Sequence, residues 1–278
     1  MSTERIAQRF VVAAVIGLSI AWLIWAFNGF SLTDANAYRL AAERLIHGQN
    51  IYAQAPNQDE AFRYAPWFAV AWVPIAALPK AAGDALWLIA LAGASVVAVL
   101  PLARQASLAA RLLAALGVSM LLWTTARGNV HPLVMLALIH GLERRAGPLW
   151  VALAASIKAV PILFVLIYLA KREWWRAILT VAITALLVLP MPFLGWHLGT
   201  VDAGESLSLY YLVSPVAWAV VAVVAVLTAT AIALRAPRYA PFAAAVAAIL
   251  SLPRLLLYDL TYVLVGAGEP WWRGIMRD

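Results

Sequence analysis

Long apolar runs separated by short polar segments make up most of the chain. The first run, Phe10–Phe30, holds about twenty nearly uninterrupted apolar residues, the length that crosses a bilayer core. It is too long for the apolar part of a signal peptide and lacks a small-residue cleavage site, so it predicts a retained helix. Later runs predict further membrane helices, roughly eight to ten crossings in all. They are Pro66–Pro79, Leu86–Ala103, Leu108–Ala126, Pro132–Leu142, Leu149–Ala170, Ala177–Trp196, Pro215–Leu234 and Pro241–Gly266.

Two of these runs are interrupted by residues that do not suit a straight membrane helix. Lys158–Pro161 breaks the run Leu149–Ala170, and Pro253 with Arg254 breaks the run Pro241–Gly266. A broken or re-entrant helix is tolerated in a membrane only where it lines a cavity within the protein. We therefore expect an all-α polytopic bundle in which the broken helices surround a cavity.

The longest polar stretch is Ser31–Tyr64, and it follows the first apolar run directly. Apolar residues at helical spacing predict an amphipathic helix on the membrane surface, starting at Thr33 or Asp34 and ending at His47-Gly48. This start places Asp34 at the membrane surface. Its carboxylate is suited to capping the helix, to acting as a general base on a lipid-borne substrate, or to both.

The composition identifies the environment of the chain. Of its 278 residues 65% are hydrophobic and 12% are charged, with a mean hydropathy of +0.87. A soluble domain is roughly half apolar and about a quarter charged, so this is a membrane protein. The net charge of +7 lies in basic clusters beside apolar runs, where it favours contact with anionic membrane lipids rather than nucleic acid. Cysteine is absent and the four histidines are scattered, so we expect no metal and no other cofactor.

The basic residues also predict the topology. Arg5 and Arg9 place the N-terminus in the cytoplasm, so the loop at about 31–65 and a second polar loop at about 197–213 lie outside. No linker or soluble domain interrupts residues 1–278, which form a single transmembrane domain. If the other basic clusters are all cytoplasmic, both broken runs must either turn back or cross twice, with their breaks on or near the outer side. Those clusters are Arg144-Arg145, Lys171-Arg172 with Arg176, Arg235 with Arg238, and Arg273 with Arg277.

Four ionisable residues within or beside apolar segments need a partner, because a charge in the membrane is costly. They are Arg127, Lys158, Arg254 and Asp259. In one interpretation Arg254 pairs with Asp259 as a structural ion pair and Lys158 reaches up to the membrane interface. In the other, the cations meet at one cavity and hold the phosphate or pyrophosphate of a lipid, for which Arg and Lys are natural partners.

Short motifs run in order along nearly the whole chain. They comprise Asp34 with Tyr38; Ala41, Ala42, Leu45, Gly48 and Tyr52; Tyr64, Pro66, Ala69 and a slightly shifted Pro74; and the segments RGNVHPLVMLAL, ALAASIKAVPILF, SPVAW and LPRLLLYDLTYVL. Together they resemble glycosyltransferase family 87. Members of this family are polytopic GT-C enzymes that use a polyprenyl-phosphate-linked mannose or a related sugar, so the resemblance implies a GT-C-like helical bundle.

The resemblance also implies an activity and a set of site residues. The enzyme would transfer a sugar, mannose first of all, from a polyprenyl-phosphate donor to a hydroxyl of a lipid or glycan acceptor, with inversion. Its active site would face the outside of a bacterial plasma membrane. Asp34 would be the catalytic base. Lys158 and Arg254 would bind the donor phosphate, and Arg63 and Arg127 are further candidates for that role. Residues expected in the sugar or acceptor pocket are Tyr38, Tyr64, Asn129, His131 and Asp259.

The chain departs from the family pattern in two places. Asn129 stands where Gln is usual and His131 where Asn is usual, and the chain is shorter than most members. These departures predict a sugar or acceptor specificity different from that of typical members. The alternative is that the chain is a degenerate, inactive member of the family. Two other classes remain, a transporter or flippase for a lipid-linked or anionic solute and a non-catalytic membrane subunit. For the transferase Asp34, Lys158 and Arg254 should meet at the outer surface, whereas for a transporter they should meet near mid-bilayer.

Overall fold

The computed structural model describes residues 13–15, 17–24, 28, 31–55, 60–105, 107–196 and 206–267, and every regular element among them is helical. The predicted all-α architecture is therefore confirmed. Its α-helices are α2 (Thr33–Ile46), α3 (Pro66–Ala76), α4 (Lys80–Ala103), α5 (Leu108–Ala126), α6 (His131–Leu136), α7 (Gly147–Ile157), α8 (Val165–Ala170), α9 (Trp174–Val188), α10 (Pro190–Phe193), α11 (Leu209–Leu212), α12 (Pro215–Arg235), α13 (Ala240–Leu250) and α14 (Val263–Gly266). The tighter or wider helical turns are η2 (Ala137–Gly141), η3 (Val160–Phe164), η4 (Pro237–Tyr239) and η5 (Leu257–Tyr262).

Four helices in the described part are long and apolar enough to cross a membrane. They are α4, α5, the continuous stretch of α9 and α10, and α12. The other apolar runs form shorter helices, so helices of spanning length account for four of the eight to ten predicted crossings. The predicted first helix is described only in parts. Arg5, Arg9, the pair Arg273 and Arg277, and residues 197–205 of the second polar loop lie outside the described residues.

The first broken run forms a hairpin made of α7, η3 and α8. Helix α7 ends at Ile157, the backbone of the next residue, Lys158, is extended, and η3 and α8 then run back toward the start of α7. In α8 the Tyr168 hydroxyl donates to the carbonyl of Leu142, and a Cβ on Gly147 would lie 2.5 Å from that hydroxyl. The open ends of this first hairpin therefore lie together, and Lys158 stands at its tip.

The second broken run forms a hairpin made of α13, η5 and α14. Residues 251–256 between α13 and η5 are not helical, and Arg254 lies among them. At the other end, a Cβ on Gly266 in α14 would lie 2.8 Å from the Cα of Phe242 in α13. The second hairpin is thus also closed at its base, with Arg254 at its tip. Both broken runs therefore turn back, which is one of the two paths that the basic clusters in the sequence allow.

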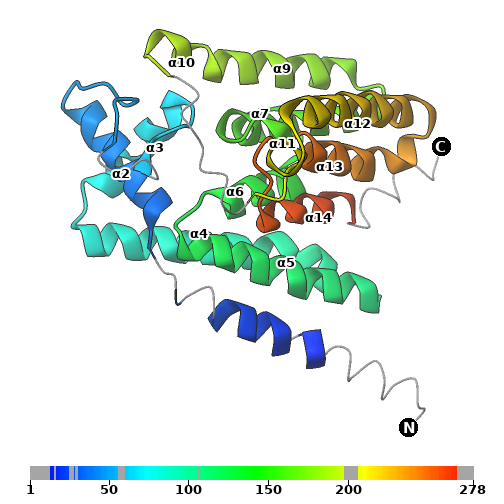
Figure 1. The fold of residues 1–278 in the computed structure, drawn as a ribbon, viewed down its shortest axis with the longest axis horizontal. Helices are drawn as coiled ribbons and strands as arrows, with labels where there is room; N and C mark the ends of the chain where they lie inside the picture. Colours follow the sequence, from blue (N-terminus) through cyan, green and yellow to red (C-terminus); the bar gives the residue numbers. More distant parts are fainter. Residues whose placement is uncertain are drawn as a thin grey trace.

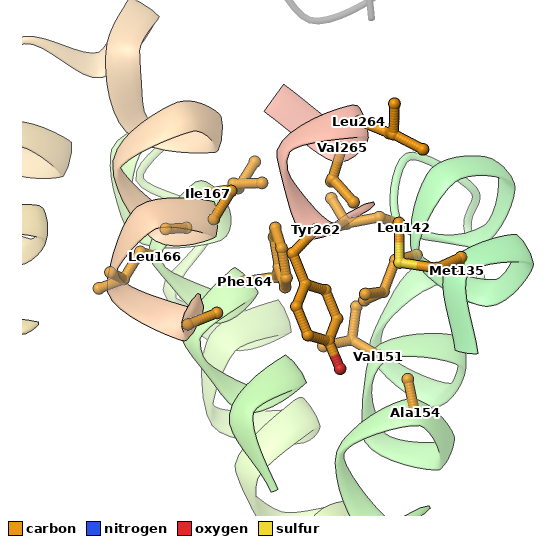
Figure 2. Close-up of a cluster of buried hydrophobic side chains, with 14 of the residues drawn as sticks. Met135, Leu142, Val151, Ala154, Phe164, Leu166, Ile167, Tyr262, Leu264 and Val265 are labelled. Atoms are coloured by element: carbon orange, nitrogen blue, oxygen red, sulfur yellow. The ribbon is translucent and has the colours of Figure 1, made fainter. Parts of the chain in front are cut away.

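The two hairpins pack against each other in one hydrophobic core (Figure 2). Tyr262 is fully buried at its centre, and its ring centroid lies 6.1 Å from that of Phe164 in the first hairpin. Met135 and Leu142 close the core from the side of α6 and η2. Helix α13 contributes mainly buried alanines, and such small residues let membrane helices approach closely where little hydrophobic force acts between them.

Helices α2 and α3 form a smaller unit at one end of the molecule (Figure 1). Buried Arg39 in α2 donates hydrogen bonds to the carbonyls of Ile75, Ala76 and Leu78 at the end of α3. Carbonyls at the end of a helix lack the donors that those in its interior have, so the guanidinium caps the end of α3 and fixes it against α2.

The ends of the bundle differ in their chemistry. At the basic end, Arg176 at the start of α9 donates to the carbonyls of Leu142 and Arg144. Past the other end of α9, a Cβ on Gly195 would lie 3.3 Å from Nδ2 of Asn50, and Figure 1 shows α10 at the same end as α2 and α3. The turn 142–147 and the loop around Asn50 therefore lie at opposite ends.

This arrangement predicts that Asn50 and Arg145 face opposite sides of the membrane. The chain has no cysteine, so Asn50→Cys and Arg145→Cys each introduce a single thiol, and both native residues are exposed. A membrane-impermeant maleimide should label Asn50→Cys in intact cells and Arg145→Cys only after permeabilisation, because basic turns favour the cytoplasm. Equal labelling after denaturation is the control. Labelling of both positions from the same side would contradict the two-ended bundle.

Candidate active site

A polar cavity of about 240 Å³ lies where the tips of both hairpins meet the start of α2 and the end of α5. It brings together seven of the ten predicted site residues, which are separated by up to 220 positions in the sequence. Those seven are Asp34, Arg63, Tyr64, Arg127, Asn129, Lys158 and Arg254, and the other lining residues are Thr33, Trp123, Thr124, Ile157, Leu256 and Tyr258.

Asp34 is the second residue of α2 and does not cap it. The N-cap is Leu32, and no side chain makes a capping hydrogen bond there, so the prediction of Thr33 or Asp34 as the cap is wrong. Instead the Asp34 backbone N–H donates to the carbonyl of Arg127, 3.0 Å away, and its carboxylate accepts from Nδ2 of Asn129 at 3.1 Å. The contacts of this side chain therefore lie at the cavity.

Lys158 faces the second hairpin from the tip of the first. Its Nζ lies 3.5 Å from Oδ1 of Asp259, 3.4 Å from the hydroxyl of Tyr258 and 4.5 Å from the centre of the Tyr258 ring. The expected pairing of Arg254 with Asp259 is therefore replaced by a pair between Lys158 and Asp259. Because this pair is largely buried, Lys158 is held in the cavity wall by Asp259.

Cations outnumber carboxylates around the cavity. Arg63, Arg127, Lys158 and Arg254 line it, whereas Asp34 is the one acidic side chain among its lining residues in the described part of the chain. Asp259 lies behind Lys158 and offsets part of its charge. The remaining positive charge suits an anion, and a guanidinium can bind a phosphate through two parallel hydrogen bonds.

Three predicted pocket residues lie behind the cavity wall. The Tyr38 hydroxyl donates to that of Tyr64 at 3.1 Å, and the Tyr38 ring is packed edge-on among other aromatic rings. His131 is fully buried, with Nε2 2.8 Å from Oγ1 of Thr261, and Asp259 pairs with Lys158. These three side chains support lining residues instead of lining the cavity themselves.

The environment of Asp34 affects its ionisation. Burial raises the pKa of Asp34 above its usual value, while the Asn129 hydrogen bond and the charges of Lys158, Arg127 and Arg254 lower it in part. A carboxylate with a raised pKa is a stronger base when ionised, which suits proton abstraction.

Tyr258 also lines the cavity and packs its ring against Lys158, although it was not among the site residues predicted from the sequence. It could have been identified from the sequence because it is adjacent to Asp259, in the apolar run that Pro253 and Arg254 interrupt. Trp123 also lines the cavity but was not predicted as a site residue, because an aromatic residue near a helix end is typical of the membrane interface. No group of three or more His, Cys, Asp or Glu side chains in the described residues is placed to hold a metal ion.

A larger apolar groove of about 540 Å³ adjoins the polar cavity, and Ile157 lines both. Four tryptophans contribute to its wall: Trp67, Trp72, Trp87 and Trp150. At its far end the groove reaches His140 and Arg144, beside the basic turn that precedes α7. The groove thus leads from the polar cavity toward the basic end of the bundle.

Comparison with known proteins gives one match. The sequence model of glycosyltransferase family 87 matches residues 62–203, just over half of the chain. No curated protein and no solved structure matches. The matched region contains Arg63, Tyr64, Arg127, Asn129 and Lys158 of the cavity.

The pair between Lys158 and Asp259 predicts a specific pattern of stability. Lys158→Met should lower the free energy of unfolding by about 3–5 kcal/mol, because it leaves a buried carboxylate without its partner. Adding Asp259→Asn should recover most of that loss, since the amide is neutral and its oxygen can still accept from the Leu256 N–H. Thermal unfolding in detergent measures both. Equal destabilisation of the single and double variants would show that the pair does not stabilise the fold.

Proposed function

The chain belongs to glycosyltransferase family 87 and is a membrane glycosyltransferase, and from this premise we propose that its donor is a polyprenyl-phosphate sugar. The sugar is mannose by the family resemblance, and the acceptor is a hydroxyl of a lipid or glycan. The cavity faces the extracytoplasmic side, because the basic turns at the opposite end of the bundle favour the cytoplasm.

The observation that carries this proposal is the meeting of one carboxylate with four cations in a single cavity. Asp34 accepts the proton of the acceptor hydroxyl as its oxygen attacks the anomeric carbon of the sugar. Attack occurs on the face opposite the leaving group, so the configuration inverts. The bond between the anomeric carbon and the phosphate oxygen breaks, and the polyprenyl phosphate departs with the bonding electron pair.

The cations act mainly on the leaving group. A phosphodiester donor carries one negative charge, and the phosphate it releases carries up to two, so negative charge grows during the reaction. Fixed cations at that position stabilise the transition state more than the bound donor, which is the requirement for catalysis. Lys158 and Arg254, at the two hairpin tips, are our assigned phosphate partners, with Arg63 and Arg127 beside them.

The apolar groove supports a lipid-linked donor. It begins at Ile157, next to Lys158, so a phosphate held at Lys158 would place its hydrocarbon chain at the entrance of the groove. Burial of a hydrocarbon chain against apolar and aromatic walls is favourable in proportion to the area covered. A water-soluble nucleotide sugar offers no group to fill this groove.

Asp34→Asn is the first test of the proposal. It removes the proton acceptor and retains an oxygen that can accept from Asn129, so turnover should fall by about two to four orders of magnitude. The fold and donor affinity should be preserved, because Asp34 does not cap α2. The measurement is transfer of labelled mannose from polyprenyl phosphate by purified protein in liposomes.

Asp84→Asn is the matched control, since Asp84 pairs with Lys80 one helical turn away in α4 and does not line the cavity. It should keep the wild-type rate. Near wild-type turnover by Asp34→Asn would remove Asp34 from the catalytic role. Movement of the labelled lipid across the bilayer without formation of a glycoside would instead support a transporter.

The donor site is tested by comparing two substitutions on long-chain and truncated donors. Arg254→Gln should weaken binding of both by about tenfold or more, because each loses a charge-assisted contact with phosphate. Ala71→Trp fills the groove and should weaken only the long-chain donor. Val70→Trp, on an exposed face of the same helix, is its control. Equal effects of Ala71→Trp on both donors would place the lipid chain elsewhere.

A further inference from the structure

The turn 127–131, between α5 and α6, is fixed to α2 by contacts on both sides of the Asp34 carboxylate. The N–H of Asp34 donates to the carbonyl of Arg127, and the N–H of Val130 donates to the Tyr38 hydroxyl at 3.3 Å. Gly128 has a φ of 71°, and a Cβ there would lie 2.6 Å from the Cβ of Ala35. This close approach requires glycine and places the turn against the start of α2.

Within this turn, Asn129 holds its amide in one orientation. Its Oδ1 accepts from the N–H of His131 at 2.9 Å, which identifies the oxygen because a backbone N–H can only donate. The Nδ2 group therefore faces the Asp34 carboxylate and donates to Oδ2 at 3.1 Å. The side chain is buried. Both the oxygen and the nitrogen of the side-chain amide therefore make hydrogen bonds.

We propose that Asn129 is a positioning residue for the base, holding Asp34 Oδ2 so that Oδ1 receives the acceptor proton. This inference rests on the proposed function, and it assigns Asn129 a role different from that of a sugar or acceptor contact. A purely structural asparagine would need only Oδ1, which closes the turn through the His131 N–H. The bond from Nδ2 to a carboxylate is an additional contact that the turn itself does not require.

The same turn also fixes the base relative to the phosphate site. The Thr261 hydroxyl donates to the carbonyl of Tyr258, so it accepts from Nε2 of His131 at 2.8 Å. The His131 ring lies 4.9 Å from the Tyr258 ring, which in turn packs against Lys158. A continuous series of contacts therefore runs from Asp34 through Asn129 and His131 to the second hairpin and Lys158.

Several other titratable or charged groups lie around Asp34. They are Arg63 and Tyr64 before α3, Arg127 after α5, Lys158 at the tip of the first hairpin, Arg254 and Tyr258 from the second hairpin, and Tyr38 on α2 itself. The Asn129 hydrogen bond lowers the pKa of Asp34 alongside the three nearby cations. Its removal should therefore move the acid limb of the activity profile to higher pH, since protonated Asp34 cannot act as the base.

The test compares Asn129→Asp with Asn129→Ala. Asn129→Asp keeps the oxygen that accepts from the His131 N–H, and so keeps the turn, but it sets a second carboxyl against Asp34. We expect its kcat to fall about ten- to hundredfold with the KM for the donor unchanged, because the base is displaced or protonated. Asn129→Ala should lower kcat and raise the pH at which Asp34 protonates. Thr180→Ala, which loses a buried hydroxyl in α9, is the control for stability.

The protonation of Asp34 is followed independently of activity by infrared difference spectroscopy of its carboxyl band, identified by its loss in Asp34→Asn. A wild-type kcat and pH profile in Asn129→Asp would overturn the proposal, as would an unchanged Asp34 midpoint in Asn129→Ala. If the wild-type protein forms no glycoside, the proposed function fails. The infrared midpoint still decides whether Asn129 controls Asp34.

Discussion

The ion pair between Lys158 and Asp259 joins the two re-entrant hairpins at their tips. A charge buried among apolar helices is costly unless it is paired, so each hairpin fixes the position of the other. The Tyr258 ring beside Lys158 strengthens this junction, and the core around Tyr262 holds the rest of the two hairpins together. The cavity exists because both helical runs are interrupted at this junction and turn back there, whereas two continuous helices would cross the bundle.

The proposed function depends on opposite charges that lie close together without forming an ion pair with one another. Asp34 is held by Asn129 and by the hydrogen bond from its own N–H to the Arg127 carbonyl, whereas Lys158 is held by Asp259. Each charged group therefore has a partner of its own and remains available at the cavity. Under the proposed function, a proton acceptor can then lie near a phosphate site without forming an ion pair that would occupy both, and the adjoining groove would hold the lipid chain.

The positions of charged residues in apolar runs were the most informative part of the sequence. Lys158 and Arg254 interrupt two runs, and these interruptions indicated broken or re-entrant helices around a cavity. The basic clusters indicated which ends of the helices lie together. Pairing was less predictable: Asp259 lies five positions from Arg254 in sequence, yet it pairs with Lys158 from the other hairpin. Side-chain direction at a break depends on local backbone geometry, which residue spacing does not fix.

The sequence by itself determined that the chain is an all-α membrane protein, where its helices break, and which side chains are candidates for the chemistry. These features depend on local composition, because twenty apolar residues or one buried cation have the same consequence in any fold. Only the tertiary structure decided that Asp34 contacts Asn129 and caps nothing, that Tyr38, His131 and Asp259 stand behind the cavity wall, and that a groove continues from the cavity. Such relations join residues far apart in the chain, and the packing of the hairpins against α2 and α5 sets their distances.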